Sequence, residues 1–182
     1  MERKTMFVLA SLAAGFLIFF VSKGIALGII FALLWFDKVI IGVFEPLRYL
    51  GIDLTTMATV LLALAYGPFF ALVFCIIVIP ILHAIKHVII PDMESQWPIF
   101  IPSPYDGVNA FGALVAGLVA GWPLIAIMFV TLFAKYAAYA FVDLALYGRP
   151  VDFVSAFTNF LFNMLLTLYA GRFFLGLVGI AK

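Results

Sequence analysis

Long apolar runs dominate the hydrophobic pattern of this chain. They do not alternate with polar positions as the strands of a β-barrel would, so we expect them to form helices. A helix needs about 20 mostly apolar residues to cross a bilayer, and two of the runs, 54–66 and 108–121, are too short to cross upright without help from their neighbours. A polar connection with four prolines, 91–105, is expected to be a loop at the membrane interface. The runs cover 6–21, 24–44, 54–66, 69–90, 108–121, 124–146 and 153–180.

Composition turns this pattern into a fold class. Hydrophobic residues make up 67% of the 182 positions, charged residues make up 10%, and the mean hydropathy is +1.27. Soluble domains carry about 25% charged residues, so we expect an integral membrane protein of the cell membrane with many passes. The prediction is an all-α bundle of six or seven spans that forms one domain over residues 1–182. Residues 6–44 form either two spans or one crossing and a surface segment, and the positive-inside rule gives opposite orientations for these two counts.

Polar positions gather at one end of the predicted bundle. Spans after Asp53 alternate in direction, so the start of one run and the end of the next lie at the same membrane level. Ionisable groups in lipid cost about 2.5–3.5 kcal/mol each, which favours a shared polar pocket open to one face. Helix-end snorkelling explains Asp53 or Asp152 equally well, but it explains less of the residues deep within long runs. The polar set comprises Asp53, Thr55, Thr56, His83, Lys86, His87, Tyr105, Asp106, Asn109, Lys135, Tyr136, Tyr139, Asp143, Asp152, Thr158, Asn159 and Asn163.

Motifs exclude several classes of function. No P-loop, dinucleotide fingerprint or intramembrane protease arrangement is present, so we expect a protein that is not an enzyme and does not hydrolyse ATP itself. A net charge of +1 without a Lys/Arg run gives no surface for nucleic acid. His83 and His87 share a helical face, but Ala84 excludes an HExxH motif, so a polar pocket wall is favoured over a metal site. We therefore expect neither a metal nor a cofactor.

Small residues form a second pattern. Their spacing of four allows membrane helices to approach closely. The stripes 112/116/120 and 113/117/121 are expected to pack within the bundle. Ala10 and Ala14 form a similar face on the first run, and that face suits a partner protein equally well.

Three segments in order resemble the substrate-binding (S) component of energy-coupling-factor (ECF) vitamin transporters. They are LGIDLTTMATVLLALAYGPFFAL from Leu50, PILHAIKHVIIP from Pro80 and YDGVNAFGALVAGLVAG from Tyr105. The resemblance implies a six-helix fold that holds a vitamin-sized ligand near the outer face, together with a transmembrane partner protein and two ATPase subunits. It also implies that the Ala10 and Ala14 face contacts the transmembrane partner. The chain departs from the family in the extra apolar sequence of 24–43 and in the absence of a basic loop at 121–123.

The leading hypothesis is a membrane-embedded, high-affinity binding component for uptake of a small, ring-bearing, vitamin-like solute. It would deliver the solute to an ECF-type transmembrane protein and its ATPases. In this hypothesis tyrosines stack on the solute, amides and a lysine bind its polar groups, and further polar residues form the rim. The stacking residues are Tyr105, Tyr136 and Tyr139, the polar contacts Lys135, Asn159 and Asn163, and the rim Asp53, Asn109 and His83.

Two alternatives remain open. A non-transporting scaffold or accessory subunit of a larger membrane complex would fill its polar half with hydrogen bonds, with Lys135 paired to Asp37 or Asp143. A metal- or proton-coupled transporter would instead use His83, His87 and nearby acids.

Overall fold

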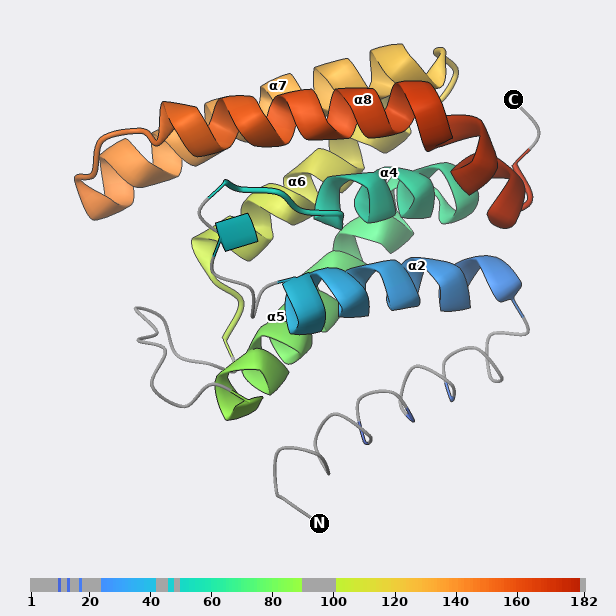
Figure 1. Ribbon diagram of the computed structural model, residues 1–182, viewed down its shortest axis with the longest axis horizontal. Coiled ribbons are helices and arrows are strands. Elements are labelled where there is room, and N and C mark those ends of the chain that lie inside the picture. Colours follow the sequence, from blue (N-terminus) through green and yellow to red (C-terminus); the bar gives the residue numbers. More distant parts are fainter. Residues whose placement is uncertain are drawn as a thin grey trace.

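The fold is all-helical, as the pattern predicts, in the part of the chain that the computed structural model describes. That part comprises residues 24–41, 50–89 and 101–180 together with Ala10, Ala13, Leu17, Pro46 and Leu47, except for the side chains of Lys86, Val88 and Ile89. The helices, shown in Figure 1, are α2 (Ile25–Trp35), the π-helix η1 (Phe36–Ile40), α4 (Thr55–Tyr66), α5 (Pro68–Ile89), α6 (Pro104–Leu118), α7 (Leu124–Val142), the π-helix η3 (Asp143–Tyr147) and α8 (Phe153–Leu177).

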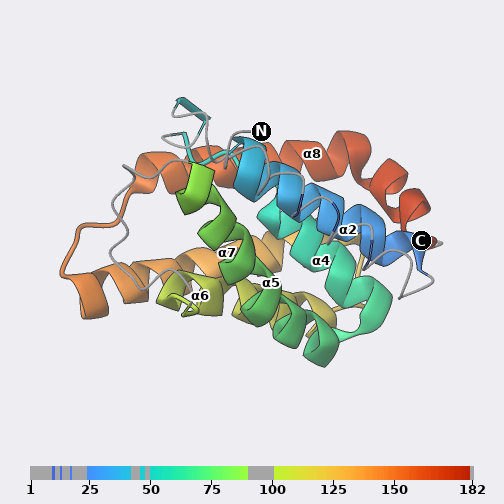
Figure 2. The ribbon, with the colours of Figure 1, turned by 90° about the horizontal axis from the view of Figure 1, so that it is seen from below.

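The short helix α4 forms the centre of the bundle. It packs against α2, α5, α6, α7 and α8. Figure 1 shows α4 between α8 above and α2 below, and in Figure 2, seen from below, α2 lies in front of α4. Every residue from Thr55 to Ala63 is buried. A helix surrounded by protein needs no solvent-facing polar side, which explains why this 12-residue helix carries no charged residue and is largely apolar around its circumference.

The Gly67-Pro68 turn ends α4 and starts α5, as predicted. Gly67 has a φ of 87°, which favours glycine, and Pro68 is the first residue of α5, where its fixed φ suits a helix start. A Cβ on Gly117 of α6 would lie 2.5 Å from Cβ of Pro68. This part of the small-residue stripe therefore packs inside the bundle, as expected.

One boundary prediction is wrong. Helix α6 begins at Pro104, within the segment 91–105 that the pattern assigned to a loop. Ser103 and Asp106 form a capping box, in which Oγ of Ser103 accepts from the Asp106 amide at 3.2 Å and Oδ2 of Asp106 accepts from the Ser103 amide at 2.8 Å. Pro104 at the first helical position adds to this start signal. Residues 90–100 lie outside the described residues.

In the described part of the chain, three helices are long and apolar enough to cross a membrane. They are Pro68–Ile85 of α5, Leu124–Tyr147 of α7 with η3, and Phe153–Leu177 of α8. Their outer surfaces carry large exposed apolar side chains such as Phe69, Phe133 and Tyr169. Shorter helices such as α4 and α6 complete the bundle, and the count of six or seven spans stays a prediction. Ala10 is helical and exposed, whereas Ala14 and most of run 6–21 lie outside the described residues.

Candidate functional site

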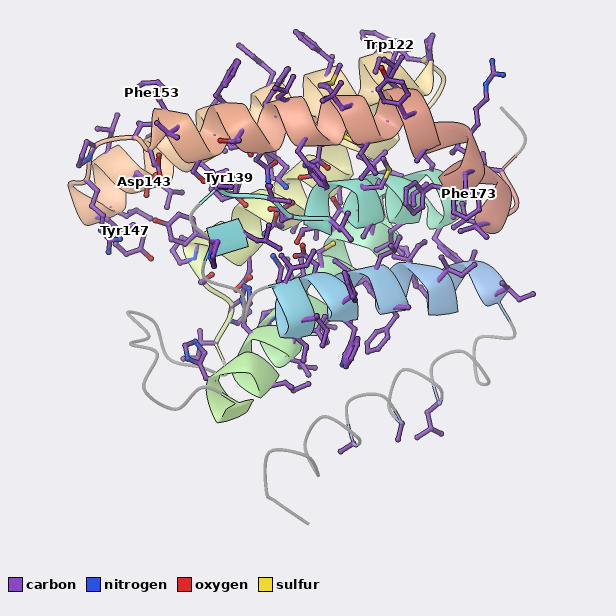
Figure 3. The ribbon with its side chains drawn as sticks, viewed as in Figure 1. Trp122, Tyr139, Asp143, Tyr147, Phe153 and Phe173 are labelled. Atoms are coloured by element: carbon purple, nitrogen blue, oxygen red, sulfur yellow. The ribbon has the colours of Figure 1, made fainter. Side chains whose placement is uncertain are left out.

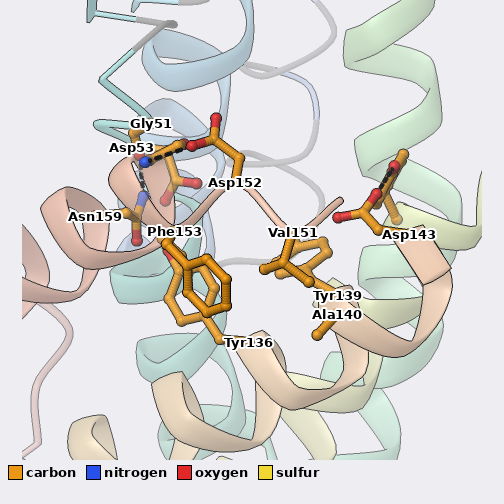
Figure 4. A pocket seen from close by; sticks show the side chains of 13 residues that line it. Gly51, Asp53, Tyr136, Tyr139, Ala140, Asp143, Val151, Asp152, Phe153 and Asn159 are labelled. Carbon is orange, nitrogen blue, oxygen red and sulfur yellow. Dashed lines mark hydrogen bonds between the residues drawn. The ribbon is translucent and has the colours of Figure 1, made fainter. Parts of the chain in front are cut away.

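A cavity of about 330 Å³ lies at the polar end of the bundle. Its walls come from the segment before α4, the first turn of α6, the end of α7 with η3, and the start of α8 (Figure 4). Figure 3 shows Asp143, Tyr147 and Phe153 at this end, far from Trp122 and Phe173 at the other. The lining residues are Gly51, Asp53, Tyr105, Tyr136, Tyr139, Ala140, Asp143, Val151, Asp152, Phe153, Ser155, Ala156 and Asn159.

Tyrosines form one wall of the cavity. The ring centroids of Tyr136 and Tyr139 on α7 lie 5.9 Å apart, and those of Tyr139 and Tyr105 lie 5.8 Å apart. Tyr147 extends this row at the Tyr105 end, where the two rings stack with their centroids 5.5 Å apart. These separations lie within the range of favourable aromatic pairs, so the rings form a continuous aromatic surface.

Amide side chains of α8 hold the floor of the cavity. Asn159 donates from Nδ2 to the carbonyl oxygen of Gly51. Asn163, one turn further along α8, donates from Nδ2 to Oδ1 of Asn159 at 3.0 Å and to the carbonyl oxygen of Asp53 at 3.3 Å. Gly51 has a φ of 65°, and a Cβ there would overlap Oγ of Ser155. The segment before α4 is therefore fixed closely to α8.

The three carboxylates among the described lining residues have different surroundings. Asp143 accepts a hydrogen bond from the hydroxyl of Tyr105 at 2.5 Å. Asp152 is the N-cap of α8 and accepts from the Ser155 amide at 3.0 Å. By contrast, Oδ1 of Asp53 is buried and accepts no hydrogen bond from the described part of the chain.

Lys135 lies behind the tyrosine wall. It is 2% exposed, and its Nζ donates to Oγ1 of Thr56 on α4 at 2.6 Å. The Nζ atom also lies 5.9 Å from the centroid of the Tyr139 ring. A Cβ on Gly112 would lie 2.6 Å from Cδ of Lys135, so glycine on α6 leaves the space that the lysine stem fills.

The suggested pairing of Lys135 with Asp37 or Asp143 is not formed. Asp37 accepts from the Leu54 amide at 2.6 Å and from Oγ1 of Thr55 at 2.7 Å, and it pairs with Lys38 at 3.0 Å. It therefore caps the start of α4 from the π-helix η1. Asp143 instead accepts the hydrogen bond from the hydroxyl of Tyr105.

The structure divides the residues predicted for the site into three groups. Five line the cavity, namely Asp53, Tyr105, Tyr136, Tyr139 and Asn159. Lys135, Asn163 and Asn109 lie behind its walls, and Asn109 accepts from the Tyr139 hydroxyl at 3.1 Å. Asn109 and His83 are thus not at the rim. His83 lies away from the cavity, with its Nδ1 3.2 Å from Oδ1 of Asp106.

The residues named for the site left out several lining residues that local sequence signals could have added, and two of these, Asp143 and Asp152, already belonged to the predicted polar set. Ala140 and Asp143 follow Tyr136 by four and seven positions, so they share its face of α7. Asp152 three positions before Ser155 is a recognisable helix N-cap signal. Gly51, Val151, Phe153, Ser155 and Ala156 reach the cavity only through the packing of segments that are distant in sequence.

The described residues contain no group of three or more His, Cys, Asp or Glu side chains arranged to hold a metal ion. No family model matches the chain, and neither a curated protein nor a solved structure does.

Proposed function

We propose that this protein is a membrane-embedded binding component for uptake of a small, ring-bearing, vitamin-like solute. The observation that carries the proposal is the cavity at the polar end, with its tyrosine wall and its few convergent polar groups. Small-molecule sites have volumes of about 300–1,000 Å³ and are mostly apolar with a small number of placed polar groups. A cavity of about 330 Å³ suits a single ring with a short substituent.

The lining chemistry supports recognition rather than reaction. Tyr105, Tyr136 and Tyr139 offer ring faces for stacking, and Asp53 and Asn159 offer polar atoms at the floor. The other polar residues predicted to contact the solute, Lys135 and Asn163, support these walls from behind. A solute held in this way would be bound and released unchanged.

Transport would draw its energy from partners, because the chain has no nucleotide-binding motif. In the proposed arrangement an ECF-type transmembrane protein and two ATPase subunits supply that energy in the cell membrane. This part of the proposal rests on the resemblance of the three segments. Ala10, which is exposed, fits a surface for the transmembrane partner.

The test compares two alanines on the same helix. Ala140 lines the cavity, whereas Ala137, three positions earlier on α7, is exposed and does not line it. We expect the wild-type protein purified in mild detergent to carry a small molecule in native mass spectrometry, or to gain thermal stability with one member of a vitamin panel. Ala140→Phe should abolish both signals by filling the cavity, and Ala137→Phe should keep them. Absence of both signals in the wild type would contradict the proposal.

A scaffold or accessory subunit is the second candidate, favoured by the hydrogen bonds beneath the cavity. Asp37 with Thr55, Lys135 with Thr56, and Tyr139 with Asn109 connect neighbouring helices without any ligand. A scaffold should co-purify with the same partner proteins whether residue 140 is Ala or Phe. If native mass spectrometry finds stable partners but no small molecule, this candidate replaces the first.

A further inference from the structure

Among the described residues that line the cavity, all charged side chains are acidic. They are Asp53, Asp143 and Asp152, and the described lining contains no Lys, Arg or His. Two described cations have partners outside the cavity: Lys135 donates to Thr56 behind the wall, and Arg149 lies over the ring of Tyr147, 5.1 Å from its centroid. A negatively charged solute would therefore meet only like charges on the described lining residues, which repel it.

Asp53 is the lining carboxylate that lacks a donor. Its Oδ1 is buried without a hydrogen bond from the described residues, whereas Asp143 and Asp152 each accept one. Lys135 is buried in the same polar layer, but its ammonium donates to Thr56 and forms no ion pair with any described carboxylate. Asp53 as a whole is half-buried, but a buried oxygen without a hydrogen bond is costly, so a donor that reaches Oδ1 from the cavity would be favourable.

A second unfilled acceptor lies beside it. Asn163 is fully buried, and its Oδ1 has no hydrogen-bond partner among the described residues. Its Nδ2 donates to the backbone carbonyl of Asp53, so this acceptor lies behind the cavity wall close to the Asp53 backbone. A bridging water would connect it to a ligand at Asp53, and the two unfilled acceptors together favour a ligand that brings N–H donors.

The aromatic wall, like the carboxylates, favours a positively charged ligand. Ring faces of tyrosine attract cations, and this row already does so with the protein's own groups, Lys135 at Tyr139 and Arg149 at Tyr147. We propose that the cavity binds an organic cation, an ammonium or a positively charged nitrogen ring, that stacks on the tyrosine wall and pairs with Asp53. This inference rests on the proposed binding function and narrows it to one class of solute.

The direct test uses three probes of similar size and different charge, namely benzylamine, benzyl alcohol and benzoate. Binding to the wild-type protein in nanodiscs is measured at neutral pH, where benzylamine is a cation. We expect its Kd to be at least about tenfold lower than that of benzyl alcohol, since a cation–π contact and a paired charge together exceed 1.4 kcal/mol. Benzoate should show no binding.

Paired variants locate the charge. Asp53→Asn keeps the size of the side chain but removes its charge, so it should weaken benzylamine binding about tenfold and leave benzyl alcohol unchanged. Asp152→Asn preserves the helix cap, because asparagine is an equally good N-cap, and its effect on benzylamine should be smaller. Equal benzylamine affinity in wild type and Asp53→Asn would overturn the role of Asp53.

Other outcomes separate this inference from the function on which it rests. If benzyl alcohol or benzoate binds as tightly as benzylamine, the cavity binds solutes but the cation preference is wrong. If none of the probes binds, the test is the charge of a solute that co-purifies with the wild type. A cation supports the inference, and an anion or a neutral molecule overturns it. If no probe binds and no solute co-purifies, the binding function itself fails.

Discussion

The two ends of this bundle are closed in different ways. At one end the chain reverses through Gly67-Pro68 and through 121–123, and Pro68 presses against Gly117 with no space for a further carbon atom. At the other end, helices meet through hydrogen bonds such as Tyr105 to Asp143 and Asn159 to Gly51, and a cavity remains between them. Close apolar packing fixes the first end, and polar groups leave room for a solute at the second.

The central helix shows how one segment serves both ends. It starts with Thr55 and Thr56, whose hydroxyls bond to Asp37 and Lys135, and it ends in apolar residues before Gly67. Helix α6 also changes from polar to apolar along its length. Asp106 and Asn109 lie at the polar end of the bundle, and its small residues lie at the apolar end. The following substitutions test this contrast in order of expected effect.

Asp37→Ala should have the largest effect on stability. It leaves Lys38 without its partner and the start of α4 without the acceptor for Leu54 and Thr55. Removal of one member of a buried pair costs about 3–5 kcal/mol. The free energy of unfolding, measured by SDS titration in micelles, should fall by this amount. Asp37→Asn, which keeps acceptor capacity, should lose less, and a loss below about 1 kcal/mol for Asp37→Ala would show that η1 does not hold the polar end together.

Gly117→Ala should be the next most damaging change and acts at the apolar end. The added carbon would meet Pro68 Cβ at 2.5 Å and its backbone Cα at 2.8 Å, so α5 and α6 must separate. Overpacking of this kind costs about 1–3 kcal/mol, although Ala otherwise favours a helix over Gly. The same SDS titration measures this loss.

Gly121→Ala is the matched control for Gly117→Ala. Gly121 belongs to the same stripe, but a Cβ added there would have no atom within 4 Å. Its unfolding free energy should stay close to that of the wild type. Equal effects at both glycines would mean that the apolar end is not tightly packed.

Much of this contrast was predictable from the sequence. Apolar runs predicted α4, α5, α7 and α8 because continuous hydrophobicity at these lengths leaves few alternatives to a helix. Alternation of the spans then placed the polar residues at a common end, where Lys135 contacts Thr56 and Tyr139 contacts Asn109. The start of α6 could also have been predicted, since Ser103, Pro104 and Asp106 form a known helix-start signal. The prolines of 91–105 favoured a loop instead.

The partners within the polar layer were not predictable. Two carboxylates, Asp37 and Asp143, were equally plausible partners for Lys135, and the structure gives it neither. Both acids lie in π-helical turns, whose wider spacing redirects side chains in a way that a 3.6-residue pattern does not describe. The cavity likewise depends on the contact of Gly51 with Ser155, two residues without any sequence signal that relates them.

Tyr105→Phe should have a moderate effect confined to the polar end. It removes the hydrogen bond to Asp143 and keeps the ring that stacks with Tyr147 and Tyr139. A hydrogen bond to a charged group contributes about 1.5–3 kcal/mol when buried, and this one is partly exposed, so we expect a loss of about 1 kcal/mol. Tyr169→Phe on α8, where the side chain is 83% exposed, should change nothing measurable by the same titration. A loss as large as that of Gly117→Ala would remove the distinction between a packed end and an open one.

Lys135→Met should have the smallest effect on stability, although Lys135 is among the most deeply buried side chains. Methionine fills the space along Gly112 that the lysine stem occupies, and it loses the hydrogen bond to Thr56 and the contact of the ammonium with the Tyr139 ring. It also removes a buried ammonium that no described carboxylate pairs with, and replacement of buried charges by apolar groups of similar volume is often neutral or stabilising. The unfolding free energy should therefore stay within about 1 kcal/mol of the wild type. Lys135→Ala, which removes the stem as well, should cost about 2–3 kcal/mol through the space it leaves. If Lys135→Met is as destabilising as Lys135→Ala, the ammonium itself holds α7 to α4, and the polar end is then as firmly fixed as the apolar one.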